Sequence, residues 1–338
     1  MTKRYLGNII TQNPTAPADN FESTPANGVW SLAEAFAYSK AGLWPTAGNV
    51  VPIGLFAGNE TNVIQQINIM TTGNATDFGD LNYSPDNPGG CSSVTRGLFA
   101  GGYASGYENR IEYVTIASAG NASDFGDLTV ARGYFSGLSS ATRGVFAAGF
   151  GNSGAINVID YVTIASVGNA TDFGDMSGVD SRNACAASPT RGLIKKSFDG
   201  STRFNIIEYI TIASVGNAID FGDMSYISSD PFGCSNSTRA VFSGGYDGSS
   251  ERNNIEYVTI TSTGNATDFG DLTQARSQGV GLSGGDRAVF AAGTTGGKVN
   301  TIDYVTITSL GNAVDFGDAV SVAAGMGGCS NAHGGLAA

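Results

Sequence analysis

One short segment recurs six times along the chain at nearly constant spacing. It reads Gly-Asn-Ala-Ser-Asp-Phe-Gly-Asp at residues 120–127, and successive copies of its phenylalanine are 47, 48, 48, 48 and 47 residues apart. These phenylalanines are Phe78, Phe125, Phe173, Phe221, Phe269 and Phe316. A regular period of this length, with one short apolar unit per repeat, is the signature of a repeat architecture in which each unit buries its apolar face against its neighbours.

Each repeat contains four segments with the character of short strands. In the second repeat the first segment ends at residues 90–93, the second covers 96–102, the third covers 111–118 and the fourth lies around 124–128. Glycine pairs and Gly-Asn turns lie between them. The chain has 49 glycines in 338 residues and only 14% charged residues, a composition typical of all-β proteins with many tight turns. We therefore predict an all-β fold, a six-bladed β-propeller of four-stranded blades of about 48 residues each.

The two ends of the repeat region predict how the ring closes. The first repeat begins directly at its second strand, residues 54–58, and the tail at residues 324–331 matches the missing first strand. A C-terminal strand in that position would complete the first blade and leave no free sheet edge. The prediction is a propeller over residues 51–338, preceded by a separate segment over residues 1–50.

The N-terminal segment is predicted to be an extended arm with one short helix. Prolines punctuate residues 11–27, and within residues 29–45 Ser31 and Glu34 have the spacing of a capping box. The helix would pack on its own propeller or dock into a partner or sister subunit. The candidate anchor residues are Tyr5, Trp30, Leu32, Phe36 and Trp44.

Charge and hydropathy argue against several classes of protein. The formal net charge of −12 is opposite to that of a nucleic-acid groove, which needs clustered Lys and Arg. No stretch approaches the ~20 apolar residues of a membrane span, so we expect no membrane insertion. The basic start is followed by an apolar run that Asn8 and Gln12 interrupt, which does not fit a signal peptide.

Cysteine and histidine offer little for catalysis or metal binding. Cys91, Cys185, Cys234 and Cys329 recur near one repeat position, which other repeats fill with leucine, so we predict free, buried thiols. A disulfide framework or metal site would need thiols from different blades to converge, which we do not expect. The sole histidine, His333, has no evident partner for Ser–His or Cys–His chemistry. No cofactor and no metal are predicted.

Recurrent polar residues are interpreted as structural. Asp-Phe-Gly appears six times without the other kinase motifs, so we expect its phenylalanine to pack between blades. The Asn-Ala-Thr and Asn-Ala-Ser sequences match a glycosylation pattern but fall in the repeated turn. Five repeats pair an arginine with a carboxylate, and the first repeat lacks both, which predicts five arginine–carboxylate contacts rather than one active site. The residues are Arg96, Arg143, Arg191, Arg239 and Arg287 with Glu112, Asp160, Glu208, Glu256 and Asp303.

The loop between the second and third strands differs in every repeat. In a propeller these loops emerge on one rim, and several carry Tyr, Phe or Arg, which are common in binding surfaces. The same aromatic residues would also serve to pack beneath the loops, and both interpretations remain open. The candidate ligand-binding residues are Tyr103, Tyr107, Phe150, Phe198, Arg203, Phe204, Tyr246 and Arg252.

Two resemblances add to these expectations. A glycine pair, then a tyrosine, then a larger aromatic resembles the kelch repeat, with Phe where kelch repeats usually carry Trp. Residues 3–10, 28–32 and 43–45 resemble the N-terminal segment of structural proteins in tailed phages of aquatic bacteria, including cyanophage-like ones. The Thr-Arg-Gly-Val-Phe-Ala and Ala-Thr-Asp-Phe-Gly-Asp-Leu repeats are similar to those of their tail-fibre proteins.

The phage resemblance implies a virion structural protein, assembled in the host cytoplasm. A tail fibre or adhesin would be anchored to other virion proteins through residues 1–50, would form a homo-oligomer with a trimer favoured, and would contact a host-surface glycan or protein. The alternatives are a purely architectural component (nozzle, baseplate, tail tip or capsid decoration) and, third, a glycan-cleaving propeller enzyme. We expect no enzyme, because the carboxylates repeat around a ring instead of forming one constellation.

Overall fold

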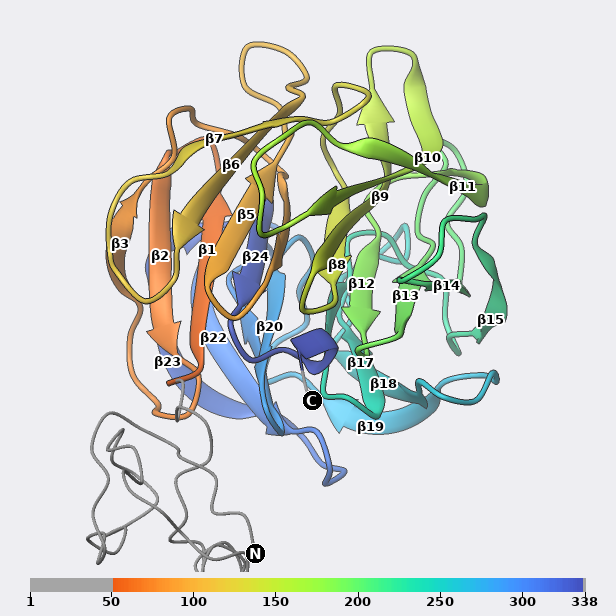
Figure 1. The fold of residues 1–338 in the computed structure, drawn as a ribbon. Helices are drawn as coiled ribbons and strands as arrows, with labels where there is room; N and C mark the ends of the chain where they lie inside the picture. Colours follow the sequence, from red (N-terminus) through yellow and green to blue (C-terminus); the bar gives the residue numbers. More distant parts are fainter. Residues whose placement is uncertain (1–50, 337–338) are drawn as a thin grey trace, which may run out of the picture. The chain divides into compact units, whose positions relative to one another are not determined.

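A computed structural model describes residues 51–336 of the chain. Their strands form six four-stranded antiparallel sheets arranged as the blades of a β-propeller (Figure 1). The predicted fold, the number of blades and the number of strands per blade are confirmed. The predicted arm and helix, with the anchor residues Tyr5, Trp30, Leu32, Phe36 and Trp44, lie outside the described residues.

Each blade is written here from its innermost strand outward. Blade 1 consists of β24 (Met326–Ser330), β1 (Ile53–Gly58), β2 (Val63–Asn68) and β3 (Thr76–Asp80). Blade 2 consists of β4 (Gly89–Ser92), β5 (Arg96–Ala100), β6 (Arg110–Thr115) and β7 (Ser123–Asp127). Blade 3 consists of β8 (Ser136–Ser139), β9 (Arg143–Gly151), β10 (Gly154–Thr163) and β11 (Thr171–Asp180).

The second half of the ring repeats this order. Blade 4 consists of β12 (Ala184–Ala187), β13 (Arg191–Lys195), β14 (Ile206–Thr211) and β15 (Ile219–Asp223). Blade 5 consists of β16 (Phe232–Ser235), β17 (Arg239–Ser243), β18 (Asn254–Thr259) and β19 (Thr267–Asp271). Blade 6 consists of β20 (Val280–Gly284), β21 (Arg287–Ala291), β22 (Val299–Thr306) and β23 (Val314–Ala323). One 3-10 turn, η1 (Gly334–Leu336), follows β24.

The C-terminal strand closes the ring as predicted. β24 pairs antiparallel with β1, placing Cys329 opposite Leu55, so the first blade is built from both ends of the described chain. The innermost strands β4, β8, β12, β16, β20 and β24 each contact the next around the axis. Closure removes the free edge that an open stack of sheets would expose.

The apolar core lies between neighbouring blades. In β5 every residue after Arg96 is buried, in β6 three of the six residues are buried, and in β7 only Phe125 is buried. The buried side chains therefore gather along the blade faces near the axis and thin out toward the edge. The cluster that contains Phe78 of blade 1 also contains Phe99 and Val114 of blade 2. Each blade is thus stabilised by its neighbours.

The repeated phenylalanine occupies a β-bulge. In blade 2, Ile111 pairs with Gly126 and Glu112 with Asp124, which leaves Phe125 without a partner across the strands. The same shift occurs at the equivalent position of the other five blades. A bulge bends its strand and redirects the extra side chain, and Phe125 belongs to the core cluster that also contains Phe146 of blade 3. The prediction that this residue packs between blades is confirmed.

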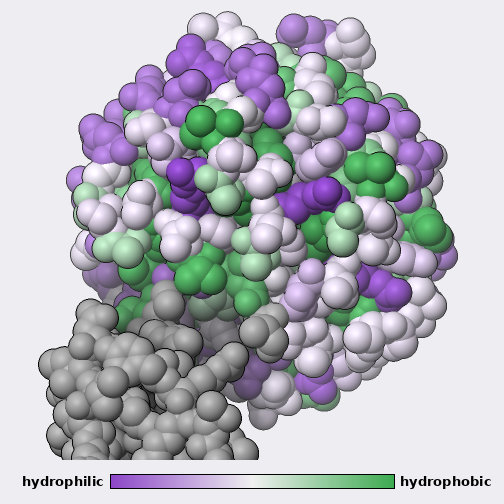
Figure 2. Space-filling model, viewed as in Figure 1, coloured by the Kyte–Doolittle hydropathy of each residue, from purple (hydrophilic) through white to green (hydrophobic). Residues whose placement is uncertain are grey.

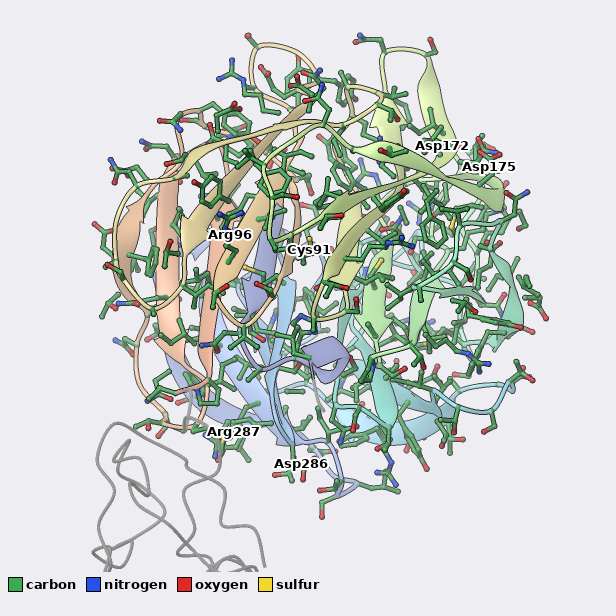
Figure 3. All side chains as sticks on the ribbon, in the orientation of Figure 1. Cys91, Arg96, Asp172, Asp175, Asp286 and Arg287 are labelled. Carbon is green, nitrogen blue, oxygen red and sulfur yellow. The ribbon has the colours of Figure 1, made fainter. Side chains whose placement is uncertain are left out.

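A belt of hydrogen bonds joins the outer edges of the blades. Between blades 1 and 2, the Gly120 N–H donates to the Phe78 carbonyl at 2.8 Å, and Asn121 Oδ1 accepts from the Asp80 N–H at 3.1 Å. The equivalent asparagine bond is present at all six junctions. Two aspartates of this motif, Asp172 and Asp175, lie at the periphery (Figure 3). We call these turns and strands the outer belt, and their asparagines have the predicted structural role.

The prediction of five arginine–carboxylate pairs is wrong. Arg96 (labelled in Figure 3) stacks over the Tyr113 ring at 4.6 Å and donates from Nη1 to the Ile164 carbonyl of blade 3 at 3.0 Å. Both contacts recur for Arg143, Arg191, Arg239 and Arg287. Adjacent residues of a strand point to opposite faces, so an arginine on the Tyr113 face does not meet Glu112.

The carboxylates instead serve the junction with the preceding blade. Glu112 accepts a hydrogen bond from the Asn82 N–H at 2.9 Å, just after the outermost strand of blade 1. Asp160 accepts from Arg132, and Asp303 from Arg276, each at 2.7 Å with both partners fully buried. Buried charges persist where they are paired in this way. Their structural role was predicted correctly, but their partners were not.

Candidate functional site

The innermost strands line a channel along the propeller axis. At the end near η1 they enclose a cavity of about 60 Å³ that is lined by Cys91, Cys185, Cys234 and Cys329 together with His333. The strands that carry the cysteines therefore do converge, contrary to prediction, because equivalent positions of a closed ring all face one axis. Cys91 lies toward the centre of the propeller in Figure 3.

The thiols themselves are structural. All four cysteines are free and buried, as predicted. The sulfur of Cys91 points into the blade interface, because a Cβ on Gly144 of blade 3 would lie 2.6 Å from it. Burial raises the pKa of the Cys91 thiol well above its usual value, which keeps it protonated and weakly nucleophilic. Among residues 51–336, no cluster of three or more His, Cys, Asp or Glu side chains is arranged to hold a metal ion.

His333 closes this end of the channel and has a serine partner that the sequence did not suggest. Its Nε2 lies 3.0 Å from Ser139 Oγ and 3.2 Å from the Ser92 carbonyl. Its Nδ1 accepts from the Gly335 N–H at 3.1 Å, so the proton of the neutral ring resides on Nε2. Nε2 therefore donates to Ser139 instead of taking its proton, and the pair is not arranged as a base and nucleophile.

The other end of the channel is encircled by backbone hydrogen bonds. Arg182 N–H donates to the Tyr134 carbonyl at 2.6 Å, Asp230 N–H to Arg182 at 3.0 Å, and Gln278 N–H to Asp230 at 3.0 Å. The series continues through the equivalent residues of the remaining blades until it closes on itself. We call this circle the mouth ring; it consists of Asn87, Tyr134, Arg182, Asp230, Gln278 and Gly325.

The mouth ring combines one backbone conformation with five different side chains and, at Gly325, none. Its φ angles lie between +51° at Asn87 and +69° at Gly325, in the left-handed region that favours glycine. Only blade 1 has glycine there, where a Cβ would lie 2.4 Å from Asp86 Oδ1. Non-glycine residues in this conformation cost on the order of 1–2 kcal/mol each, and such strain is concentrated at functional sites.

Three consecutive ring residues interact in series. The Arg182 guanidinium lies 4.8 Å from the centre of the Tyr134 ring and forms an ion pair with Asp230 at 3.1 Å. Burial raises the pKa of the Asp230 carboxyl, and Arg182 opposes that rise. Tyr134, Arg182, Asp230 and Gln278 also line a small cavity of about 40 Å³ at the channel mouth. The ring thus presents polar side chains at the mouth of the channel.

A larger cavity of about 390 Å³ extends outward from the mouth ring over blades 4 to 6. We call it the face cavity. Arg182, Asp230 and Gln278 form its inner side, and loop residues form the rest. These loop residues are Phe198, Arg203, Ser229, Tyr246, Glu251, Ser277 and Thr294. Its volume falls in the range of ~300–1,000 Å³ that small-molecule sites occupy.

Three of the eight predicted rim residues line this cavity. The Arg203 guanidinium lies between the rings of Phe198 and Tyr246, 5.1 and 4.9 Å from their centres. This contact joins the loop of blade 4 to that of blade 5. Stacking of a guanidinium on aromatic faces holds the three side chains in one arrangement.

The other five rim residues lie outside the cavity. Tyr103 and Tyr107 meet edge to face at 5.2 Å, and Phe150 is 6.2 Å from Tyr107, near the projecting β9–β10 hairpin in Figure 1. Phe204 packs against Lys196 at 4.6 Å, and Arg252 forms an ion pair with Asp247 at 2.9 Å. Tyr103 remains 43% exposed, whereas Phe204 and Arg252 make contacts that hold their loops.

Sequence reasoning missed the mouth ring. Its residues stand two positions before the innermost strand in blades 2 to 6, as Gln278 does before β20. The signal available in the sequence was variation, because this repeat position holds a different residue in every blade. Binding residues were predicted only in the loops between the second and third strands. The segments that carry the mouth ring lie beside these loops, as the bridge between Ser229 and Tyr246 shows.

The rest of the visible surface offers no comparable feature. Exposed apolar side chains are spread over several blades, with three of them, Val314, Val320 and Val322, on β23. Polar and apolar residues are interspersed over the face shown in Figure 2. Some exposed apolar residues are normal on a protein surface. In the part of the chain that the structure describes, no helix is long and apolar enough to cross a membrane.

No protein-family model and no curated protein matches this chain.

Proposed function

We propose that this protein is a structural component of a phage virion, a tail fibre or related adhesin, whose propeller recognises the host surface. The observation that carries the proposal is the mouth ring, where equivalent backbone positions hold different residues beside a cavity of about 390 Å³. A scaffold kept constant while exposed side chains vary is how recognition modules are built.

The virion part of the proposal rests on the resemblance of residues 3–10, 28–32 and 43–45, and of the glycine-rich repeats, to structural proteins of tailed phages of aquatic bacteria. Residues 1–50 would bind other virion proteins, and the chain would assemble as a homo-oligomer, with a trimer favoured. Its host-side ligand would be a surface glycan or protein.

The hydrogen bonds and ion pairs of the recurrent carboxylates and of His333 favour a non-enzymatic role. The recurrent carboxylates bind backbone N–H groups or buried arginines at blade junctions, as Glu112 and Asp160 illustrate. His333 carries its proton on the nitrogen that faces Ser139. These contacts stabilise the propeller and leave neither group poised for acid–base or nucleophilic work.

Deletion of residues 1–45 tests the anchor. The remaining propeller should keep its β-type circular dichroism and cooperative unfolding, because its core lies within residues 51–336, yet it should be absent from purified particles. The full-length protein, expressed in the same complementation system, is the control. Incorporation of the truncated protein into particles would contradict an anchor in this segment.

Binding of full-length protein to candidate host cells tests recognition. The proposal predicts saturable binding that reduces phage adsorption. No binding to any strain that the phage adsorbs to would favour the architectural role, and release of sugar from cell-surface polysaccharide would favour the enzyme.

A further inference from the structure

We propose that the face cavity binds a neutral saccharide, as a mono- or disaccharide unit of a longer surface glycan. The inference rests on the proposed recognition function and names the chemistry of its ligand. It follows from the charge, the free polar groups, the rigid walls and the strained backbone of this one cavity.

The charge of the cavity is balanced. Two cationic side chains, Arg182 and Arg203, face two carboxylates, Asp230 and Glu251. Arg182 is already paired with Asp230 at 3.1 Å. A ligand with a net charge therefore gains no overall attraction, because a side chain of its own charge lies in the same cavity as each possible counter-ion. The balance favours a polar ligand without charge.

Several polar groups of the cavity have free hydrogen-bonding capacity. Among the described residues, the Gln278 amide, the Thr294 hydroxyl and the terminal nitrogens of Arg203 have no hydrogen-bond partner. Glu251 uses only Oε1, which accepts from Ser277 Oγ at 3.4 Å. Donors and acceptors are thus mixed in one small space. Ligand hydroxyl groups, which donate and accept at once, match such a mixture.

The walls of the cavity are held in place before any ligand arrives. Arg203 is fixed by the two aromatic rings at 5.1 and 4.9 Å and by its Nε bond to Ser229 Oγ at 3.3 Å. A preformed wall reduces the ordering cost of binding. Phe198 and Tyr246 add apolar surface against which the C–H faces of a sugar ring can pack.

Gln278 gives the strongest indication that the cavity has an external partner. Its φ of +58° is one that glycine adopts without strain, and Gly325 occupies the equivalent ring position at +69°. Its backbone N–H already makes the ring bond to Asp230 at 3.0 Å, so the fold does not need the side chain. A strained residue that the fold does not require, and whose partly exposed amide has no partner within the described chain, is available to bind a ligand.

The test compares two glycine substitutions in the same ring. Gln278→Gly removes a cavity side chain, and Asn87→Gly makes the same change at φ +51° outside the cavity. Thr294→Val removes a hydroxyl from another element with little change of shape. Full-length proteins are applied to immobilised neutral oligosaccharides of hexoses and N-acetylhexosamines, and to uronate- or sulfate-bearing ones. The best neutral binder is then titrated calorimetrically.

We expect the wild type to bind neutral members of the panel. Gln278→Gly should weaken that affinity by about tenfold or more, as expected for loss of hydrogen bonds to a bound ligand, without lowering the unfolding midpoint. Thr294→Val should weaken it less, and Asn87→Gly should leave it unchanged. Binding of acidic oligosaccharides alone, no binding to the panel, or equal affinities for Gln278→Gly and wild type would each overturn the proposal.

Failure of this inference can be distinguished from failure of the proposed function. If the protein binds host cells and Gln278→Gly binds them equally well, recognition stands and the saccharide site is wrong. If the protein binds the neutral panel, Gln278→Gly weakens that binding and no host cell is bound, the cavity is confirmed as a saccharide site and its role in host recognition is contradicted.

Discussion

The outer belt and the mouth ring are both closed circles of equivalent contacts between blades, but only the belt repeats its side chains. In the belt, six equivalent asparagines, of which Asn74 is the first and Asn312 the last in the chain, accept the same hydrogen bond at the six junctions. In the mouth ring, backbone N–H and carbonyl groups complete the circle by themselves, and the side chains differ in every blade.

The difference shows which contacts constrain residue identity. Asn121 is needed in the belt because its side-chain oxygen makes the contact, and Gly79 because a Cβ there would lie 2.3 Å from the Gly120 carbonyl. In the mouth ring the backbone makes the contact, so the side chains are available for another purpose. In this molecule, side chains that recur in every blade therefore stabilise the fold. Side chains that differ between blades at one repeated backbone position form the candidate site.

Adding one methyl group to a belt glycine should have the largest effect. Gly270→Ala would place a Cβ 2.4 Å from the Gly311 carbonyl at a φ of +149°. Strained φ and forced movement of packed backbone together predict a loss of about 4 kcal/mol in the free energy of unfolding. Chemical denaturation of both proteins measures the difference.

A matched substitution separates strain from contact. Gly264→Ala has a similar φ of +155°, but no atom lies within 4 Å of its Cβ. It should cost about half as much, because only the backbone strain of ~1–3 kcal/mol remains. Equal losses for the two variants would show that close approach of the blades is not what requires glycine in the belt.

Acidification should destabilise the closed end of the channel. Burial lowers the pKa of His333 from 6.5 to about 4, so the folded state favours the neutral ring. This contribution to stability is present above pH 6.5 and is lost as the pH falls toward 4, by about 3 kcal/mol in total. Unfolding free energies of wild type and His333→Gln, measured from pH 7 to 4, provide the test.

The wild type should lose more stability than His333→Gln over that interval, while both retain the other pH-dependent terms of the fold. Parallel pH profiles would mean that His333 is protonated as easily in the folded state as in the unfolded one.

Much of the fold could be predicted from the sequence because the same pattern of strands and turns recurs six times. The spacing of the phenylalanines predicted the blades, and the match between residues 324–331 and a missing first strand predicted the closure that β24 makes with β1. The contact partners of the recurrent charged side chains were harder to predict. Arg96 and Glu112 co-occur in the repeats, yet Arg96 contacts Tyr113, and strict attention to the two faces of β6 would have indicated this.

The candidate site was only partly predictable. Phe198, Arg203 and Tyr246 were found because aromatic and arginine residues in variable loops indicate binding surfaces. Gln278 and Asp230 were missed, since a polar residue before a strand looks like an ordinary turn. Their shared left-handed φ and the closed circle of hydrogen bonds depend on three-dimensional closure, which no local pattern encodes.

The smallest predicted effect tests the contrast between belt and ring most directly. The measurement is the free energy of unfolding of Gln278→Gly, by chemical denaturation beside wild type and Gly270→Ala. Relief of left-handed strain offsets the added chain entropy of glycine, so the variant should equal the wild type or exceed it by up to about 1 kcal/mol. A loss comparable to that of Gly270→Ala would contradict the account, because the ring side chain would then be as necessary to the fold as the belt.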